Sequence, residues 1–447
     1  MKEKTLSIIL ILVIILEVIL SIVNIIYFNY LKSIMWSIVT ILLIIVSLYY
    51  SFKLKFIQFK IKNVFKSIFK KTKGEISAFE SLSISLAAKI GVGSLSGVAL
   101  SIYIGGIGSI FWMWIITFIS GIISYIEGYL GVLYQEKNNK NTLVGGPSFY
   151  IKKITNSKFL SLLYAVLIII SYIFGFITIQ SNTIVKSVNY IFNINEYIIL
   201  IVLVILTSLI IFKDIKKIAS FSSKIVPVMG IIYILLGLYI IIVNINIIPS
   251  IFINIVKSAF NFKSFFGGVL SAIIIGIQRG IFATEVGVGT SAISSSLTND
   301  TPKNQGYVHL FGNYFTSFII CTITAFIIIS AKIDTSNYLN INGIEYVIDS
   351  FIYHLGSLGT LMFLIITILF AFSTIVSGYC YGELSLEFIN KNITSNGIFI
   401  FKLLVVILVF IGGIVSSNIL WNLIDVLIAI LTIINVYSIY KLKDKIK

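Results

Sequence analysis

Histidine, cysteine and proline are scarce in this chain, and basic residues far outnumber acidic ones. The 447 residues include two histidines, two cysteines and four prolines. Cys321 and Cys380 fall in apolar runs, and His309 and His354 are well separated, so the sequence indicates neither a disulfide framework nor a metal cluster. The chain also lacks a phosphate loop with lysine, a nucleophile elbow and zinc-ligand spacing. We therefore expect no enzymatic activity and no organic cofactor.

Long apolar runs dominate what is present. Hydrophobic residues make up 58% of the chain and charged residues 11%, and the mean hydropathy is +1.05. The first run is too long for a signal peptide and lacks a small-residue cleavage pattern, so we interpret it as a retained helix. Runs of about 20 apolar residues are long enough to cross a bilayer. They predict an all-α polytopic membrane protein with about twelve transmembrane helices, over residues 6–28, 33–51, 77–103, 107–132, 158–184, 196–212, 224–245, 266–295, 307–330, 357–388, 397–417 and 419–440.

The distribution of the basic residues predicts the orientation of these helices. If the N-terminus lies inside, the cytoplasmic segments hold 26 of the 33 basic residues and the outer loops hold five. Basic residues accumulate on the cytoplasmic side of membrane proteins. We therefore expect a multi-pass protein of the plasma (inner) membrane with both termini in the cytoplasm. The net charge of +16 then reflects topology and contact with anionic membrane lipid, and no nucleic-acid partner is expected.

Two glycine-containing segments interrupt apolar runs at matching places. They read Lys89-Ile90-Gly91-Val92-Gly93-Ser94 and Glu285-Val286-Gly287-Val288-Gly289-Thr290. Broken helices at corresponding positions of two halves are typical of the binding sites of secondary transporters. Close helix packing at the glycines is the structural alternative.

The order of the predicted helices indicates an internal repeat. After two peripheral helices come two sets of five, and because five is odd the second set has inverted topology. We predict a five-plus-five inverted-repeat core (LeuT-type, APC superfamily). Its predicted parts are two peripheral helices and a basic loop over 1–75, a first repeat over 76–245, a second repeat over 266–440 and a basic tail over 441–447.

The breaks supply groups that suit an amino acid and a cation. Unwinding a helix frees backbone N–H and C=O groups. A new helix N-terminus suits a carboxylate, and freed carbonyls with hydroxyls suit a hard cation. Lys89 and Glu285 occupy equivalent repeat positions with opposite charge, so we predict that they are coupled; the alternative is that each contacts only its own polar surroundings.

Several ordered motifs resemble one known family, the alanine-or-glycine:cation symporters, also called sodium:alanine symporters. The resemblance runs from about Lys53 to Asp425. It is carried by Phe56-Ile57-Gln58, Gly74-Glu75-Ile76-Ser77, Gly91-Val92-Gly93-Ser94-Leu95-Ser96-Gly97-Val98-Ala99, Gly105-Gly106, Gly108, Ile110-Phe111-Trp112-Met113-Trp114, Glu127, Tyr134-Gln135-Glu136, Gly145-Gly146-Pro147, Phe149-Tyr150-Ile151, Arg279-Gly280-Ile281-Phe282, Glu285, Gly287-Val288-Gly289, Phe370-Ala371-Phe372-Ser373-Thr374 and Tyr381-Gly382-Glu383.

The resemblance implies sodium-coupled uptake of a small neutral amino acid of the alanine and glycine class, with Na⁺ as the coupling ion. Na⁺ would bind the Ile90 carbonyl with the Ser373 and Thr374 hydroxyls. The expected substrate-binding residues are Gly91, Gly93, Ser94, Thr284, Glu285, Gly287 and Gly378.

The chain departs from the family pattern at four of its positions. Ser94 and Thr284 replace asparagines, Thr316 replaces an aspartate, and Gly378 replaces a tryptophan. Hydroxyls are weaker ligands for a hard cation than carbonyl or carboxylate oxygens. A non-transporting amino-acid sensor, or a relative that has lost cation coupling, therefore remains an alternative, and a channel is the other.

Other polar residues in the apolar runs have less specific expected roles. Glu127, Glu383 and Asp425 lie nearer helix ends, where we expect solvated or capping side chains. The only arginine, Arg279, precedes the second break and is expected to serve as an anchor or a vestibule charge rather than as a substrate ligand. Gln180 and Asn182 share one helix and form a candidate pocket wall.

Overall fold

Almost all of the described chain is helical. The structure is a computed structural model that describes residues 25–70, 76–139, 141–155, 157–260, 270–333 and 343–446. Two short strands, β1 (Glu136–Lys137) and β2 (Leu143–Val144), pair antiparallel with Glu136 opposite Val144. The helical elements are α2 (Ile25–Lys53), η1 (Ile57–Phe59), α3 (Ile61–Ile68), α4 (Ala78–Lys89), α5 (Val92–Gly105), α6 (Ser109–Leu133), α7 (Pro147–Thr155), α8 (Lys158–Ile169), η2 (Ile170–Phe176), α9 (Ile177–Phe192), α10 (Glu196–Ile211), α11 (Ile215–Val243), α12 (Ile248–Ala259), α13 (Leu270–Thr284), α14 (Thr290–Ser295), α15 (Pro302–Tyr314), η5 (Phe315–Cys321), α16 (Thr322–Ala331), α17 (Ile344–Ile389), α18 (Ser395–Ile414), α19 (Ser417–Lys441) and η7 (Lys443–Lys445).

The helices confirm a multi-pass, all-helical membrane protein. In the described ranges, nine helical segments are long and apolar enough to cross a bilayer, and three shorter apolar helices cover Glu196–Ile211, Ile248–Ala259 and Ala272–Thr284. The expected first span, 6–28, lies almost wholly outside the described residues. The total of twelve spans therefore stays a prediction.

Besides α3, α7 and the start of α11, which lie in expected cytoplasmic loops, two further stretches that we expected to be loops are helical. The first is α12, which begins at Ile248 and has Pro249, a residue tolerated at this position, in its first turn. The second is the start of α17, which begins at Ile344 rather than at residue 357 and is kinked at Gly356, where φ is 59° and ψ is −141°. The charged residues Glu345 and Asp349 made this stretch too polar to stand out as an apolar run.

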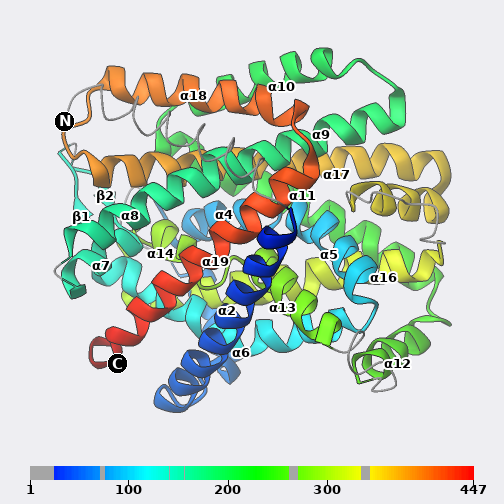
Figure 1. Cartoon of the computed structure of the whole chain (residues 1–447), viewed down its shortest axis with the longest axis horizontal. Helices are drawn as coiled ribbons and strands as arrows, with labels where there is room; N and C mark the ends of the chain where they lie inside the picture. The colour runs from blue at the N-terminus through cyan, green and yellow to red at the C-terminus, as the bar shows by residue number, and fades with distance from the viewer. Residues whose placement is uncertain are drawn as a thin grey trace.

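The two broken helices lie side by side at the centre and run in opposite directions. Helix α4 ends at Lys89 and α5 begins at Val92; α13 ends at Thr284 and α14 begins at Thr290. Helix α4 packs against α14, and α5 packs against α13. Helices α6 and α17 contact these halves as well, so the breaks are enclosed by the bundle (Figure 1).

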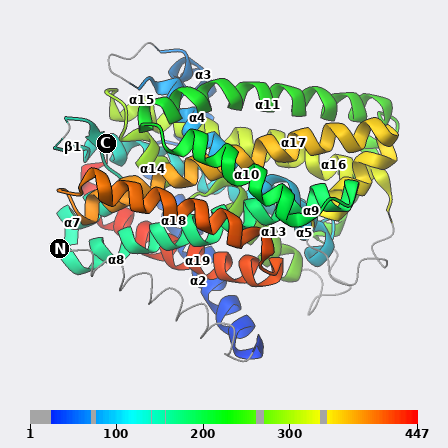
Figure 2. The ribbon, with the colours of Figure 1, turned by 90° about the horizontal axis from the view of Figure 1, so that it is seen from above.

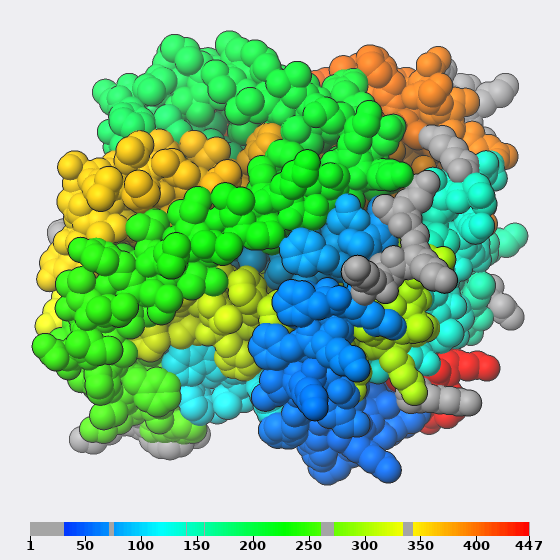
Figure 3. All heavy atoms as spheres, turned by 180° about the vertical axis from the view of Figure 1, so that it is seen from behind, coloured from blue at the N-terminus to red at the C-terminus, as the bar shows by residue number. Residues whose placement is uncertain are grey.

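The two ends of the molecule differ. The β1–β2 hairpin, α7 and the C-terminus lie at one end, and α12 lies at the other (Figure 1). Helices α11 and α17 pack side by side along the length of the molecule (Figure 2). Helix α11 crosses the opposite face as a continuous ridge (Figure 3). Its outer residues Ile231, Leu235 and Ile242 are 58%, 61% and 66% exposed, which is the pattern of a lipid-facing surface.

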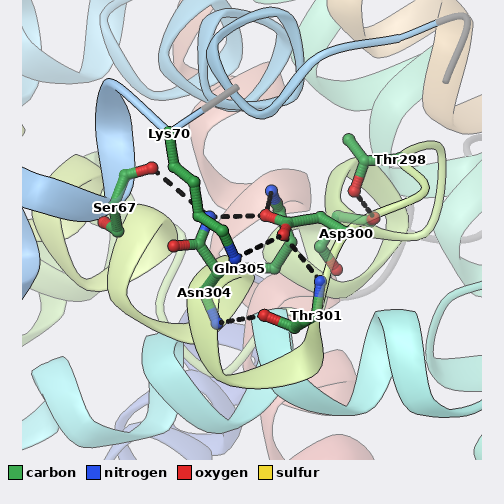
Figure 4. Close-up of polar contacts among 8 residues, drawn as sticks. Ser67, Lys70, Thr298, Asp300, Thr301, Asn304 and Gln305 are labelled. Carbon is green, nitrogen blue, oxygen red and sulfur yellow. Dashed lines mark hydrogen bonds and ion pairs between the residues drawn. The ribbon is translucent and has the colours of Figure 1, made fainter. Parts of the chain in front are cut away.

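A polar cluster fixes α3 to the segment that follows α14 (Figure 4). The Asp300 side chain, only 2% exposed, lies 3.5 Å from Lys70 Nζ. Its Oδ2 accepts hydrogen bonds from the Asn304 and Gln305 side-chain amides at 2.5 and 3.0 Å. Asn304 also donates to the Ser67 carbonyl at 3.3 Å. The basic, amphipathic α3 is therefore joined to the same chain segment that carries the second break.

Candidate functional site

The first break leaves two backbone carbonyls without helical partners. Ile90 and Gly91 leave the helical conformation, and the Val92 N–H donates to Gln180 Oε1 at 3.1 Å instead of to the preceding turn. A helix that stops at Lys89 therefore leaves the Ala87 and Ala88 carbonyls open to other partners.

Two hydroxyls of α17 reach these carbonyls. Thr374 Oγ1 donates to the Ala87 carbonyl at 2.8 Å and lies 3.4 Å from the Ala88 carbonyl, and Ser373 Oγ lies 3.4 Å from the Ala87 carbonyl. A Cβ on residue 91 would overlap Thr374 Oγ1, so only glycine permits this approach. The structure thus brings Ser373 and Thr374 to the Ala87 and Ala88 carbonyls and Thr374 to Gly91, whereas a contact with the Ile90 carbonyl stays a prediction.

The remaining predicted residues of the first break pack around it. Ser94 Oγ donates to the Gly91 carbonyl at 3.1 Å, and the Ser94 carbonyl accepts from Thr324 at 2.8 Å. A Cβ on Gly93 would lie 2.8 Å from the Phe282 ring, so this glycine permits close packing of α5 against α13. The packing interpretation therefore applies at Gly93, and the binding interpretation of the glycines stays a prediction.

The second break is a tight loop with left-handed residues. Glu285, Gly287 and Gly289 have φ of 51°, 83° and 89°. The freed Val288 carbonyl accepts from the Tyr164 hydroxyl at 2.5 Å, and the Gly287 carbonyl accepts from the Asn435 amide at 2.9 Å. Two carbonyls of this loop are therefore already bonded to protein. Thr284 Oγ1 donates back to the Gly280 carbonyl at 2.8 Å and so serves its own helix.

Three buried charged side chains meet the three consecutive residues that start α14. Glu127 Oε1 accepts from the Gly289 N–H at 2.9 Å, and Glu285 Oε2 accepts from the Thr290 hydroxyl at 2.8 Å. Lys89 Nζ donates to Ser291 Oγ at 3.1 Å. All three charged side chains are at most 1% exposed, and within the described chain Lys89 and Glu285 form no direct ion pair. The expected solvated role for Glu127 is wrong because its side chain is buried, whereas its bond to the N–H of Gly289, the N-cap residue of α14, agrees with the expected capping role.

The only arginine makes a buried, two-pronged ion pair. Arg279 Nη1 and Nη2 lie 3.2 and 3.0 Å from Asp425 Oδ1 and Oδ2. Lys32 of α2 lies 3.7 Å from the same carboxylate. Arg279 also lies over the Trp421 ring, 5.0 Å from its centroid. Arg279 is thus the expected anchor, whereas the expected solvated role of Asp425 is wrong because its carboxylate is paired inside the bundle.

Gly378 faces an aromatic pair. A Cβ on Gly378 would lie 3.3 Å from Ile177 Cγ1 and 3.6 Å from Tyr172 Cδ1. The Tyr172 ring stacks on Phe176 with centroids 4.7 Å apart. Another aromatic side chain therefore occupies the space beside Gly378.

The two residues of the candidate pocket wall have different contacts. Gln180 accepts a hydrogen bond from the first break, whereas Asn182 donates to the Val415 carbonyl at 2.7 Å and so caps the end of α18.

A cavity of about 790 Å³ opens at the end that carries the β1–β2 hairpin. Its lining includes Asn138, Asp214, Glu383, Glu387 and Lys402, and none of the predicted substrate or sodium residues. Glu383 lies five residues beyond Gly378 on α17, about 7–8 Å along the helix axis. The cavity therefore approaches the central residues from one side, while those residues stay closed.

Known proteins resemble this chain over most of its length. A family model described as the sodium:alanine symporter family matches residues 21–447. The chain belongs to the sodium:alanine symporter family. It is 34% identical to the amino-acid carrier protein AlsT of Bacillus subtilis, over 94% of this chain and 90% of that protein. It is 33% identical to the probable sodium/glutamine symporter GlnT of the same organism, over 92% and 87% of the two chains.

A solved structure supports the fold. The manganese transporter of Eremococcus coleocola superposes with a TM-score of 0.56 and 15% identity, over 80% of this chain and 78% of that one. At this identity the likeness concerns the fold alone. The sodium:alanine symporter family and its transporter relatives establish cation-coupled amino-acid symport as the activity class of the chain.

Proposed function

We propose that this family member is a sodium-coupled symporter that carries a small neutral amino acid into the cell. The observation that carries the proposal is the meeting of the Ser373 and Thr374 hydroxyls with the carbonyls freed at the first break. Neutral oxygens converging from a broken helix and a neighbouring helix are suited to a desolvated Na⁺, which binds oxygen ligands. Na⁺ would join Ile90, Ser373 and Thr374 in place of the present hydroxyl-to-carbonyl bonds.

The amino acid would bind between the two breaks. Its carboxylate would meet the start of α5 at Gly91, Gly93 and Ser94, because a helix N-terminus favours an anion. Its ammonium group would bind at the second break, near Thr284, Glu285 and Gly287. Lys89 and Glu285 would be coupled through their neighbouring contacts with Ser291 and Thr290 rather than by direct pairing. The twelve-span, five-plus-five inverted repeat is proposed with it, supported by the antiparallel packing of the broken helices.

Side-chain selection would depend on the wall beside Gly378. Because Tyr172 already fills part of that space, we propose that the tolerated side chains extend modestly beyond alanine, to serine, threonine or valine. Gly378→Trp requires Ile177 and Tyr172 to move and is expected to narrow selection toward alanine and glycine. The measurement is competition of radiolabelled alanine uptake by each amino acid. An unchanged ranking in the variant would remove Gly378 from the pocket.

Uptake of radiolabelled alanine into proteoliposomes, with and without a sodium gradient, tests the function itself. We expect accumulation against the alanine gradient only when sodium is present. The Ser373→Ala/Thr374→Ala variant should lose sodium stimulation, with sodium affinity falling roughly tenfold or more, which corresponds to about 1.4 kcal/mol. The matched control is Thr367→Ala, which removes a buried hydroxyl from the same helix about two turns before Ser373 and Thr374. Binding without flux would instead identify a sensor, and equilibration without accumulation a channel.

A further inference from the structure

The buried charges at the second break do not balance. Glu127 and Glu285 contribute two carboxylates and Lys89 one ammonium group, and none of these side chains is more than 1% exposed. Their contacts fall on the consecutive residues Gly289, Thr290 and Ser291, so the three groups share one site. An uncompensated charge in a membrane interior is costly, so a further positive charge is required there.

The carboxylates also have free positions for that charge. Glu127 Oε2 and Glu285 Oε1 are buried and have no hydrogen-bond partner in the structure. A carboxylate oxygen that is buried without a donor carries a full desolvation cost. Each carboxylate therefore has one oxygen fixed by the second break and one oxygen open.

The surroundings favour a proton over a metal ion. The groups that reach the carboxylates are donors: the Gly289 N–H, the Asn435 amide and the hydroxyls of Thr290, Ser291 and Tyr172. A sodium ion needs several oxygen acceptors at once, whereas a proton needs a single oxygen. The other titratable groups that face the site are His309 from α15, Tyr150 from α7, Tyr164 from α8, Tyr172 from η2 and Tyr381 from α17.

We propose that Glu127 and Glu285 together hold one exchangeable proton, which balances the site against Lys89. Both carboxylates interact with Lys89, so their protonation is linked through it, and the proton is assigned to the site and not to either residue alone. The site is distinct from the proposed sodium site at Ser373 and Thr374. It goes beyond sodium coupling by making the closed state of the second break dependent on a bound proton.

Infrared spectroscopy of the purified protein tests this without relying on transport. At neutral pH the wild type should show the carbonyl stretch of one protonated carboxyl. Glu127→Gln and Glu285→Gln should each lose it, because the remaining carboxylate then balances Lys89. Lys89→Met should show two protonated carboxyls, because two carboxylates then remain without a counter-charge. The exposed Glu196→Gln is the matched control and should match the wild type.

The same spectra distinguish the possible occupants. A band that is present in choline chloride and lost in sodium chloride would show that Na⁺ fills the site and would overturn the proposal. Absence of the band from the wild type in both salts would also overturn it, as would its survival in both glutamine variants. If one glutamine variant does not fold, the other and Lys89→Met still decide the outcome. Failure of alanine uptake would refute the proposed function and leave this result standing.

Discussion

Asp425 illustrates how much one buried residue can matter to this bundle. It is 1% exposed, and its two carboxylate oxygens accept hydrogen bonds from Nη1 and Nη2 of Arg279. Removing one member of a buried pair leaves an uncompensated charge and costs about 3–5 kcal/mol. We predict that Asp425→Asn markedly lowers the thermal unfolding midpoint, measured by size-exclusion chromatography of heated, detergent-solubilised protein.

Two further variants separate charge from packing at this position. Arg279→Met/Asp425→Leu should recover most of the lost stability, because apolar replacement of a buried pair is often neutral. Lys32→Gln should cost much less, because the Lys32 side chain is 23% exposed and lies farther from the carboxylate. If Asp425→Asn and Lys32→Gln were equally mild, the pair would not be important for stability.

At the scale of elements, the β1–β2 hairpin is tied to the end of α17 by surface polar contacts. Glu136 Oε2 lies 3.0 Å from Lys391 Nζ, and Oε1 lies 3.6 Å from Lys153 Nζ. Exposed pairs of this kind contribute about 0.2–1 kcal/mol. We predict that Lys391→Gln speeds hydrogen exchange of the hairpin amides by up to about fivefold, measured by mass spectrometry.

The control for this prediction is Lys152→Gln, which removes a neighbouring exposed lysine that forms no ion pair within the described residues.

Partial burial acts to raise the pKa of Glu136, but hydrogen bonding and attraction from Lys391 and Lys153 outweigh it and lower the pKa overall. The contribution of this carboxylate is therefore complete above its ordinary pKa of about 4.3 and is lost as the pH falls below that value. The hydrogen-exchange rate of the hairpin amides, corrected for the intrinsic pH dependence of exchange, should therefore rise on acidification. An unchanged corrected rate would contradict the stabilising role of the Glu136 carboxylate.

The elements also show what a sequence can and cannot predict here. The breaks at Gly91 and Gly287 were predictable, because glycine two residues from a charged residue is unfavourable in an uninterrupted membrane helix and is tolerated where the backbone lines a protein interior. The Arg279–Asp425 pair was missed because its partners lie 146 positions apart in the chain. The role of Glu127 was missed for the same reason, since only the folded chain brings it to Gly289. Hydrophobic periodicity in the sequence predicts where helices form, but the partners of buried charges are determined by how the helices pack together.

The whole molecule allows a direct test of orientation. Both native cysteines, Cys321 and Cys380, are buried, so added cysteines can be labelled against a low background. We predict that Asn392→Cys and Lys445→Cys react with a membrane-impermeant maleimide only from the cytoplasmic side. Ser250→Cys in α12, at the opposite end, should react only from outside. All three positions are exposed, and labelling of Ser250→Cys and Asn392→Cys from the same side would refute the predicted topology.

Lys32, Arg279 and Asp425 join α2, α13 and α19 by charge in the interior. Separating these helices would strand a charge, so we expect them to move as one rigid body in a transport cycle, with the bundle dividing elsewhere. Helix α2 meanwhile presents Ile38, Ile41 and Ile45, 48–59% exposed, to the surrounding lipid. If that body is the part that moves, each turnover shears α2 against the acyl chains. Turnover would then slow as membrane viscosity rises, even though no lipid contacts the substrate.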